Sequence, residues 1–283
     1  GTDAGVDPMP LFARLRYRSR VSEDLTLGAG VIAAAQRFRA VGLSNLGMLV
    51  ADGNPDALSD NGYDLSYGVG YQLGALWQAS HRWTLAAGYQ SHFSMSEFDD
   101  YSDLFAEYGA FDIPSTLKGG ISFMTTDTAR INLDVEHISY SDVDSIHNPI
   151  MNLLMGCFTA NPPVAPETSG CLGGPAGAGF GWEDVTVFKA GVAFQSDDRN
   201  TWRLGFSYGE QPIPSTEVLF NILAPGVMEY HFTAGWTSER PNGNVMSWSV
   251  MYAPSKEITG TSTFDPTQTI KLEMSQFELE FAY

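Results

Sequence analysis

The sequence predicts an all-β fold, a transmembrane antiparallel β-barrel, and three observations lead to this prediction. First, eleven segments alternate apolar and polar residues with a period of two, the pattern of a strand with one apolar face. Second, the connections alternate strictly between short and long, as periplasmic turns and extracellular loops do. Third, aromatic residues gather at the segment ends on the apolar face, as in an interfacial girdle: Trp77, Trp83, Trp202 and Tyr208. A soluble sandwich shares only the first pattern, so the other two favour a membrane barrel.

The predicted strands follow one another along the whole chain. The clearest spans residues 63–78, where one face carries Tyr, Leu, Val and Trp and the other mainly Gly, Ser and Gln. In the next strand the alternation places Phe93 on the lipid side. The last strand ends in Phe277-x-Leu279-x-Phe281-x-Tyr283, which resembles the insertion signal of outer-membrane barrels. The eleven strands are expected at about 9–20, 24–38, 63–78, 83–94, 115–125, 129–141, 184–195, 200–209, 227–238, 244–254 and 269–283.

The connections between these strands fall into two classes. Short turns are expected near 22–24, 79–82, 126–129, 196–200 and 240–244. Long extracellular loops are expected at about 39–62, 96–114, 142–183, 210–226 and 255–268. Cys157 and Cys171, the two cysteines of the chain, both lie in the third long loop. We expect a disulfide between them, which suits an oxidising compartment and would be worth about 3 kcal/mol in the chain-entropy model.

The strand number predicts that the barrel is incomplete. If the last strand ends in the periplasm, counting back eleven strands puts Gly1 on the extracellular side. Single-chain bacterial barrels have an even number of strands, and unpaired sheet edges in lipid cost several kcal/mol per exposed group. We therefore expect residues 1–283 to form a single outer-membrane barrel domain that lacks an odd number of N-terminal strands.

Composition excludes several classes of protein. The chain has 33 acidic and 15 basic residues, a net charge of −18, which argues against nucleic acid as a partner. It has no run of eighteen apolar residues, so a helical membrane span is not expected. The acidic residues cluster in the first two long loops, where a solvated surface is the simplest interpretation.

Several longer motifs point to a family. They are Asn61-Gly62-Tyr63-Asp64, Phe105-Ala106-Glu107-x-Gly109-x-Phe111-Asp112-Ile113-Pro114, Tyr140-Ser141-Asp142-Val143, Gly179-Phe180-Gly181-Trp182 and Gly209-Glu210-Gln211-Pro212-Ile213-Pro214. Together they resemble the FadL/TodX family of outer-membrane transporters for long-chain fatty acids and other hydrophobic compounds. The resemblance implies a 14-stranded barrel plugged by an N-terminal hatch, of which this chain would hold the last eleven strands. It also implies passive uptake across the bacterial outer membrane, with long-chain fatty acids as the leading cargo and aromatic hydrocarbons as the alternative.

The resemblance further implies a capture groove between the loops at 39–62 and 96–114. Both loops are rich in apolar side chains, which would bury a hydrophobic ligand at about 25 cal/mol per Å². The same side chains would also serve as a mini-core of the loops themselves. The groove residues that we expect are Leu46, Met48, Leu49, Leu104, Phe105 and Phe111.

The lumen offers a second ligand site. On the first strand Leu11, Leu15 and Tyr17 would face lipid, which turns a row of arginines inward: Arg14, Arg16, Arg18 and Arg20. These arginines could bind a ligand carboxylate or pair with inward acids such as Asp64, Asp134, Glu136 and Glu229. Lys189 is expected on an otherwise apolar inward face, where it could hold a fatty-acid headgroup. The lumenal residues that we single out are Lys189, Arg14, Arg16 and Arg203.

Other functions are weaker interpretations of the sequence. His92 and Ser94 lie two apart on one strand, a spacing that rarely allows a catalytic Ser–His hydrogen bond, so no enzyme activity is expected. No cofactor and no metal site are expected. A general diffusion porin is the alternative, and it would need a wide polar lumen. Expected partners are a hydrophobic small molecule, outer-membrane lipid and lipopolysaccharide, with the protein acting as a monomer.

Overall fold

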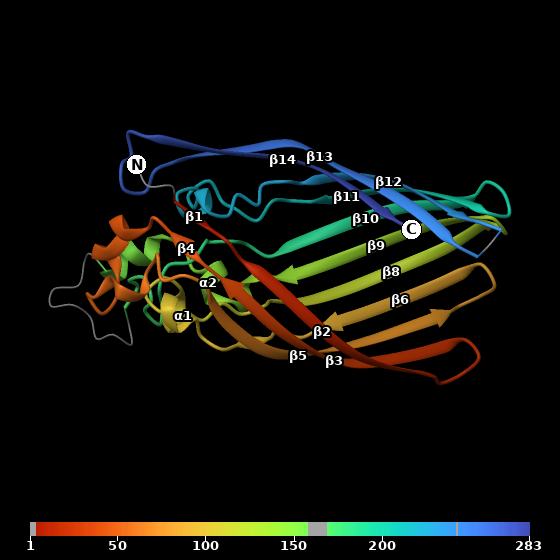
Figure 1. Ribbon diagram of the computed structural model, residues 1–283, viewed down its shortest axis with the longest axis horizontal. Coiled ribbons are helices and arrows are strands. Elements are labelled where there is room, and N and C mark those ends of the chain that lie inside the picture. Colours follow the sequence, from red (N-terminus) through yellow and green to blue (C-terminus); the bar gives the residue numbers. More distant parts are fainter. Residues whose placement is uncertain (1–3, 158–168, 242) are drawn as a thin grey trace.

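The computed structural model describes residues 4–157, 169–241 and 243–283 of the chain. Eleven long antiparallel strands form one curved sheet in which each strand pairs with its neighbour in the chain (Figure 1). They are β2 (Met9–Arg20), β3 (Leu25–Phe38), β5 (Asp64–Gln78), β6 (Trp83–Gln90), β8 (Ser115–Thr126), β9 (Ala129–Ser139), β10 (Val185–Gln195), β11 (Asn200–Gly209), β12 (Tyr230–Glu239), β13 (Val245–Thr261) and β14 (Thr269–Ala282). β2 and β14 are the two ends of the order, and they do not pair with each other within the described ranges. The predicted all-β antiparallel fold is confirmed.

The register puts apolar side chains on the outer face of the sheet and small or polar ones on the inner face. Val31 pairs with Tyr71, and their exposed fractions are 54% and 49%, as expected for side chains that face lipid. One residue along, Gly30 pairs with Gln72 on the inner face. An aromatic row crosses four neighbouring strands near the short turns, in register from Trp202 through Trp236 and Trp248 to Phe281. This row is the girdle expected at one membrane interface.

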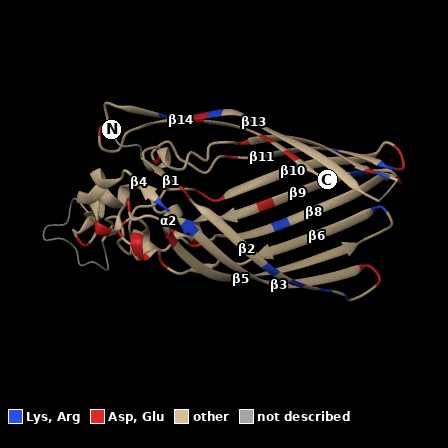
Figure 2. Cartoon of the chain, in the orientation of Figure 1, with Lys and Arg blue, Asp and Glu red and all other residues tan. Residues whose placement is uncertain are grey.

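The connections separate the two ends of the sheet. The predicted short turns are confirmed, for example at residues 79–82 and 196–199. The long connections gather at the opposite end, where Figure 1 shows their short helices and the two-stranded pair of β1 (Gly5–Val6) and β4 (Ala40–Val41). Acidic residues are frequent in these connections and sparse along the strands (Figure 2). No helix within the described residues has the length and apolar character needed to cross a membrane.

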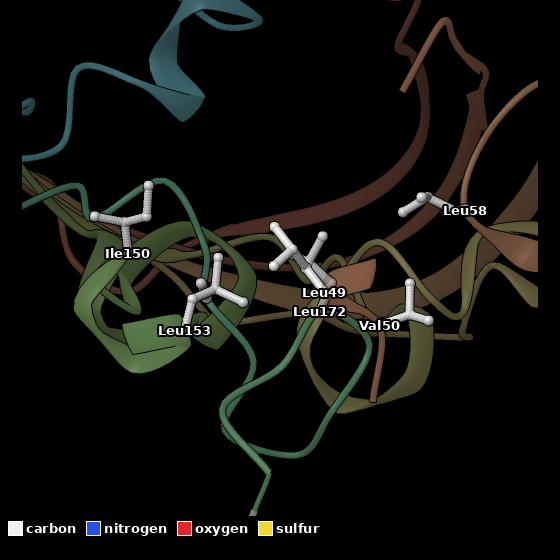
Figure 3. Close-up of a cluster of buried hydrophobic side chains, with 7 residues drawn as sticks. Leu49, Val50, Leu58, Ile150, Leu153 and Leu172 are labelled. Carbon is white, nitrogen blue, oxygen red and sulfur yellow. The ribbon is translucent and has the colours of Figure 1, made fainter. Parts of the chain in front are cut away.

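The long connections share a hydrophobic core of their own. Leu49 and Val50 lie at the end of the 3₁₀ helix η1 (Ser44–Leu49). They pack with Leu153 and Leu172 from the third long connection, residues 140–184 between β9 and β10 (Figure 3). Within this core the backbones of residues 49–51 and 172 exchange hydrogen bonds of 2.9 Å. A disulfide joins Cys157 and Cys171, as predicted. Residues 158–168 of the loop predicted at 142–183 lie outside the described residues.

The loop predicted at 255–268 is wrong. β13 continues to Thr261 and pairs with β14 as far as Thr261–Thr269, which leaves only residues 262–268 as a loop. The register shifts by a bulge between Ala253 and Lys256, and this bulge accommodates Pro254, which cannot donate to the ladder. Beyond the bulge, Ile258 and Leu272 pack on the fourth long connection, residues 210–229 between β11 and β12. Their partners there are Ile213, Val218 and Val227.

The position predicted for Phe93 is also wrong. β6 ends at Gln90, and the chain then pairs with β5 again through the two-residue strand β7 (Ser94–Met95). Between Gln90 and Ser94 the chain advances four residues while β5 advances three, from Gln72 to Val69. One extra residue turns the following side chains to the other face. Phe93 therefore points inward and is fully buried.

Candidate functional site

A cavity of about 210 Å³ lies beneath the long connections, at the loop end of the sheet. Its walls are almost entirely apolar and come from distant parts of the chain. Seven aromatic side chains line it: Phe38, Phe98, Phe105, Phe111, Phe180, Trp182 and Phe220. Aliphatic residues complete the lining, among them Val6, Leu46, Leu104, Ile146, Leu172 and Leu223. A largely apolar concave site with few polar groups is the usual form of a small-molecule binding pocket.

The second long connection (residues 91–114, between β6 and β8) presents its aromatic rings to this cavity through a strained turn. Glu107 and Tyr108 have φ angles of 56° and 61°, a left-handed conformation that is costly for residues with a Cβ. Gly109 follows at φ 105°, where a Cβ would lie 2.6 Å from the backbone oxygen of Phe98. The turn brings the Phe105 and Phe111 rings to 4.7 Å between centroids. The strained backbone therefore places this aromatic pair on the cavity.

Hydrogen bonds from the third connection hold this turn. The amides of Glu107 and Tyr108 donate to the carbonyl oxygens of Gly174 and Gly173 at 2.9 and 3.0 Å. Gly173 itself has a φ of 76°, and a Cβ there would lie 2.5 Å from the backbone oxygen of Ser102. The segment that follows the disulfide therefore fixes the cavity wall formed by the second connection.

A buried polar network positions Trp182 on the opposite wall. Its Nε1 donates to Oδ1 of Asn221 at 2.6 Å, and Asn221 has no exposed surface. Nδ2 of Asn221 donates to the carbonyl oxygens of Phe180 and Glu217 at 2.7 and 2.8 Å. Because this buried amide is satisfied on both sides, it fixes the orientation of the indole. Gly181, with φ 67°, lies against the Glu217 side chain and leaves no room for a Cβ.

The structure brings together four of the six predicted groove residues. Leu46, Leu104, Phe105 and Phe111 all line the cavity. Leu49 lies instead in the neighbouring core of the connections, with 3% of its side chain exposed. Met48 does not line the cavity and is 83% exposed on the surface. The sequence patterns did not indicate Phe38, Phe180 and Trp182 as lining residues. The Gly-Phe-Gly-Trp motif at 179–182 contains two of them, and its spacing signalled a constrained backbone.

A layer of apolar side chains lies on the inner face of the sheet, next to this cavity along β2. It contains Phe12, Ile32, Phe93 and Met95, and the Phe12 and Phe93 rings meet edge to face at 6.3 Å. Phe93 fits because Gly70 lies beneath it: a Cβ at Gly70 would be 2.0 Å from the ring. We call Phe12, Ile32, Phe93 and Met95 the apolar barrier.

A second cavity of about 700 Å³ lies on the inner face beyond the apolar barrier. The inward residues of β2 show the order: Pro10 lines the first cavity, Phe12 belongs to the barrier, and Arg14 lines the second. The second cavity is cationic, because Arg14, Arg16, Arg18 and Lys118 line it above a floor that includes Gly28, Gly74 and Gly88. The Arg14 guanidinium also contacts the barrier, at 5.4 Å from the Phe12 ring centroid.

The expected pairing of this arginine row with inward acids is wrong. No acidic side chain within the described ranges forms an ion pair with Arg14, Arg16, Arg18 or Arg20. Glu136 instead binds both Lys118, at 2.6 Å, and Lys189. Glu229 binds Lys256 at 2.8 Å. The charge of the arginine row is therefore left for another partner.

Lys189 and Arg203 are less suited to a ligand than expected. The face around Lys189 is not otherwise apolar, because Glu136 neutralises the ammonium group and Asp134 pairs with Lys189 in the strand register. Arg203 donates from Nη1 to Oγ1 of Thr237 at 2.8 Å and lines neither cavity. Contact of either residue with a ligand stays a prediction.

Two carboxyl groups of the loop region, one buried and one partly buried, have raised pKa values. Burial raises the pKa of Asp103, and the nearby Asp52 and Asp56 charges raise it further. The Ala57 amide opposes this shift by donating to Asp103 Oδ2 at 2.9 Å. Burial likewise raises the pKa of Asp112, whose Oδ2 lies 3.0 Å from Nε2 of His92. His92 therefore lies beside this carboxyl group.

Comparison with known proteins now identifies the family. The sequence model of the family described as outer membrane protein transport protein (OMPP1/FadL/TodX) matches residues 6–241. The chain belongs to the FadL/TodX family. Its membership places the protein in the outer membrane and confirms the resemblance carried by the sequence motifs. A comparison with curated proteins found no significant match.

Solved structures show the same fold at low sequence identity. The Pseudomonas putida toluene transporter TodX is 15% identical over 96% of this chain and 68% of its own, with a TM-score of 0.61. The Ralstonia pickettii toluene transporter TbuX is 16% identical over 99% of this chain and 69% of its own, with a TM-score of 0.58. A Pseudomonas aeruginosa FadL homologue is 14% identical over 98% of this chain and 66% of its own, with a TM-score of 0.57. The chain thus spans about two thirds of the length of these structures.

Proposed function

We propose that this chain forms the main part of a passive outer-membrane uptake channel for hydrophobic compounds. The observation that carries the proposal is the sequence of sites along the inner face: an apolar cavity, an apolar barrier and a cationic cavity. A hydrophobic ligand would enter the first cavity from the loops, cross the barrier and reach the lumen. A general diffusion porin would instead need a continuous polar path, which the barrier interrupts.

A long-chain fatty acid is the first candidate cargo. Its alkyl chain suits the apolar cavity, where each buried CH₂ group contributes about 0.8 kcal/mol. Its carboxylate suits the unpaired arginines that follow, because charge-assisted hydrogen bonds to guanidinium are among the strong ones. Arg14 contacts both the barrier and the second cavity, so it is the residue that a headgroup would meet first.

A monoaromatic hydrocarbon is the second candidate, and two observations favour it. The cavity of about 210 Å³ is lined by seven aromatic residues, and an engineered cavity of about 150 Å³ already binds benzene. TodX and TbuX, which share the fold, are both named toluene transporters. Such a ligand would not need the arginines.

An uptake assay separates these two candidate cargoes. Cells that express the protein are given radiolabelled oleate or radiolabelled toluene, and the uptake of each is measured. The test variant is Arg14→Gln/Arg16→Gln, and Arg199→Gln at a short turn is the matched control. For a fatty-acid channel we expect the double variant to reduce oleate uptake about tenfold, the loss of one charge-assisted contact, without changing toluene uptake. Equal loss of both ligands would contradict the headgroup role. Absence of oleate and toluene uptake in the unmodified protein would contradict the proposed function.

A further inference from the structure

The outer face carries a cationic cluster at the loop end, beside the first cavity, whose lining includes Arg37. Tyr63 lies between two guanidinium groups: the Cζ atoms of Arg37 and Arg39 are 4.2 and 4.6 Å from its ring centroid. Its hydroxyl donates to Oδ2 of Asp7 at 2.6 Å, and the same oxygen lies 3.7 Å from Nη2 of Arg39. We call Arg37, Arg39 and Tyr63 the outer arginine clamp.

The strand register shows that the clamp faces the membrane side of the sheet. Arg37 pairs with Met9 on β2 and Leu65 on β5, whose side chains are 53% and 49% exposed. Further along β5 the same face carries Tyr67, Val69 and Tyr71, all between 49% and 63% exposed. An arginine on this face is costly within hydrocarbon and is stable only where polar groups surround it.

The height of the clamp matches the headgroup layer of the outer leaflet. Tyr63 lies 14 residues from Trp77, the girdle residue at the other end of the same face of β5. With about 3.4 Å per residue and a strand tilt of about 40°, this separation spans roughly 36 Å along the membrane normal. The apolar band of such barrels is about 25 Å tall. The clamp therefore lies about 10 Å beyond the band on the side of the long loops, which is the extracellular side.

The protein does not neutralise the clamp. Two guanidinium groups face one carboxylate, that of Asp7, and no described acidic side chain forms an ion pair with Arg37. Nε of Arg37 is buried without a hydrogen-bond acceptor in the described part of the chain. One net positive charge is thus unmatched in a chain whose net charge is −18.

We propose that the outer arginine clamp binds a phosphate group of lipopolysaccharide in the outer leaflet. Guanidinium groups bind phosphate through paired charge-assisted hydrogen bonds, and stacking on Tyr63 holds both groups in place beforehand. The ligand is the phosphorylated headgroup of a lipid anchored in that leaflet, because the clamp borders the lipid-facing surface at headgroup height.

A binding experiment tests this proposal. The protein is purified from outer membranes in detergent, and its affinity for bisphosphorylated lipid A is measured. We expect Arg37→Gln/Arg39→Gln to weaken the affinity at least tenfold, and lipid A without phosphates to bind the unmodified protein as weakly. Arg37→Lys keeps the charge without the planar fork and should give an intermediate loss. The control is Arg82→Gln/Arg199→Gln, two arginines at short turns, which should bind as the unmodified protein does.

Three results would overturn the proposal. One is an unchanged affinity of the double variant for bisphosphorylated lipid A. Another is equal binding of the lipid without phosphates, which would show that the acyl chains alone are recognised. The third is full competition by inorganic phosphate at equal concentration, which would show a site for the free anion. A gel-mobility shift on heating confirms that each variant is folded before its binding is measured.

Discussion

At the residue scale, Asp103 makes the loop core sensitive to pH. Its carboxyl lies in the second connection with 9% of its surface exposed, and burial raises its pKa above the ordinary value of 3.8. A group whose folded pKa is raised binds protons more readily in the folded state. It therefore lowers stability as pH rises from about 3.8 through the folded pKa, and the loss persists at neutral pH.

We accordingly expect Asp103→Asn to stabilise the second connection at pH 7. The amide keeps an oxygen that accepts the Ala57 N–H, but it removes the buried charge. Hydrogen exchange of residues 98–110 should become several-fold slower, and its dependence on pH between 4 and 7 should weaken. Asp99→Asn, at an exposed carboxyl of the same connection, should change neither quantity. Faster exchange in Asp103→Asn at pH 7 would contradict the sign of this effect.

The residues of the candidate site were only partly predictable from sequence. Phe105 and Phe111 stand out as apolar residues in an acidic loop, and the structure places both on the cavity. Phe38 was missed because it ends a strand, where alternation assigns a side chain to a face but not to a ligand site. Trp182 was missed because its orientation depends on Asn221, 39 residues away in the chain. Contacts of this kind leave no periodic signal.

At the element scale, alternation predicted every long strand and failed where a bulge intervenes. Each bulge adds one residue and turns the following side chains to the opposite face. Near Phe93 this reversed the predicted orientation, and beyond Pro254 it hid the last seven residues of β13, 255–261. The sequence offers no local mark for the first bulge, since His92 and Phe93 fit the alternating pattern as well as their neighbours do.

The disulfide is the element that supports the cavity wall. Cys157 and Cys171 are 14 residues apart, a separation for which the chain-entropy model gives about 3 kcal/mol of stabilisation. The segment after Cys171 supplies the carbonyl groups that hold the left-handed turn at Glu107 and Tyr108. Removal of the disulfide should therefore loosen both connections while the membrane-spanning strands stay folded.

The variant Cys157→Ser/Cys171→Ser tests this dependence. We expect faster hydrogen exchange at residues 105–111 and at residues 171–177, and weaker binding of hydrophobic ligands at the first cavity. Exchange in β12 and β13 is the internal control, because these strands pair with each other and neither is joined to the connection that holds the disulfide. Unchanged exchange at residues 105–111 would show that the turn holds its strained conformation without the disulfide.

At the scale of the whole molecule, the apolar barrier separates two cavities of opposite character. The order of cavity, barrier and cavity recurs on two neighbouring strands, β2 and β3, the latter through Phe38, Ile32 and Gly28. The next strand, β5, contributes Gly70 beneath the barrier and Gln72 to the second cavity. We infer that this single layer of side chains limits the passage of water and ions between the lumen and the ligand cavity. Its central residue is Phe93, which the bulge after β6 turns inward.

Phe93→Ala should join the two cavities. Removal of this ring deletes the edge-to-face contact with Phe12 and leaves Gly70 uncovered, so ion conductance in a planar bilayer should rise severalfold. A cavity-forming Phe→Ala change costs about 3–5 kcal/mol, and the barrel should tolerate it because the change breaks no strand pairing. Phe188→Ala, at a lipid-facing ring that is 56% exposed, is the matched control and should leave conductance unchanged. Gly70→Ala displaces the same ring from below and should also raise conductance. If neither barrier variant conducts more than the control, the seal between the cavities lies elsewhere, and the path from loop cavity to lumen does not pass Phe93.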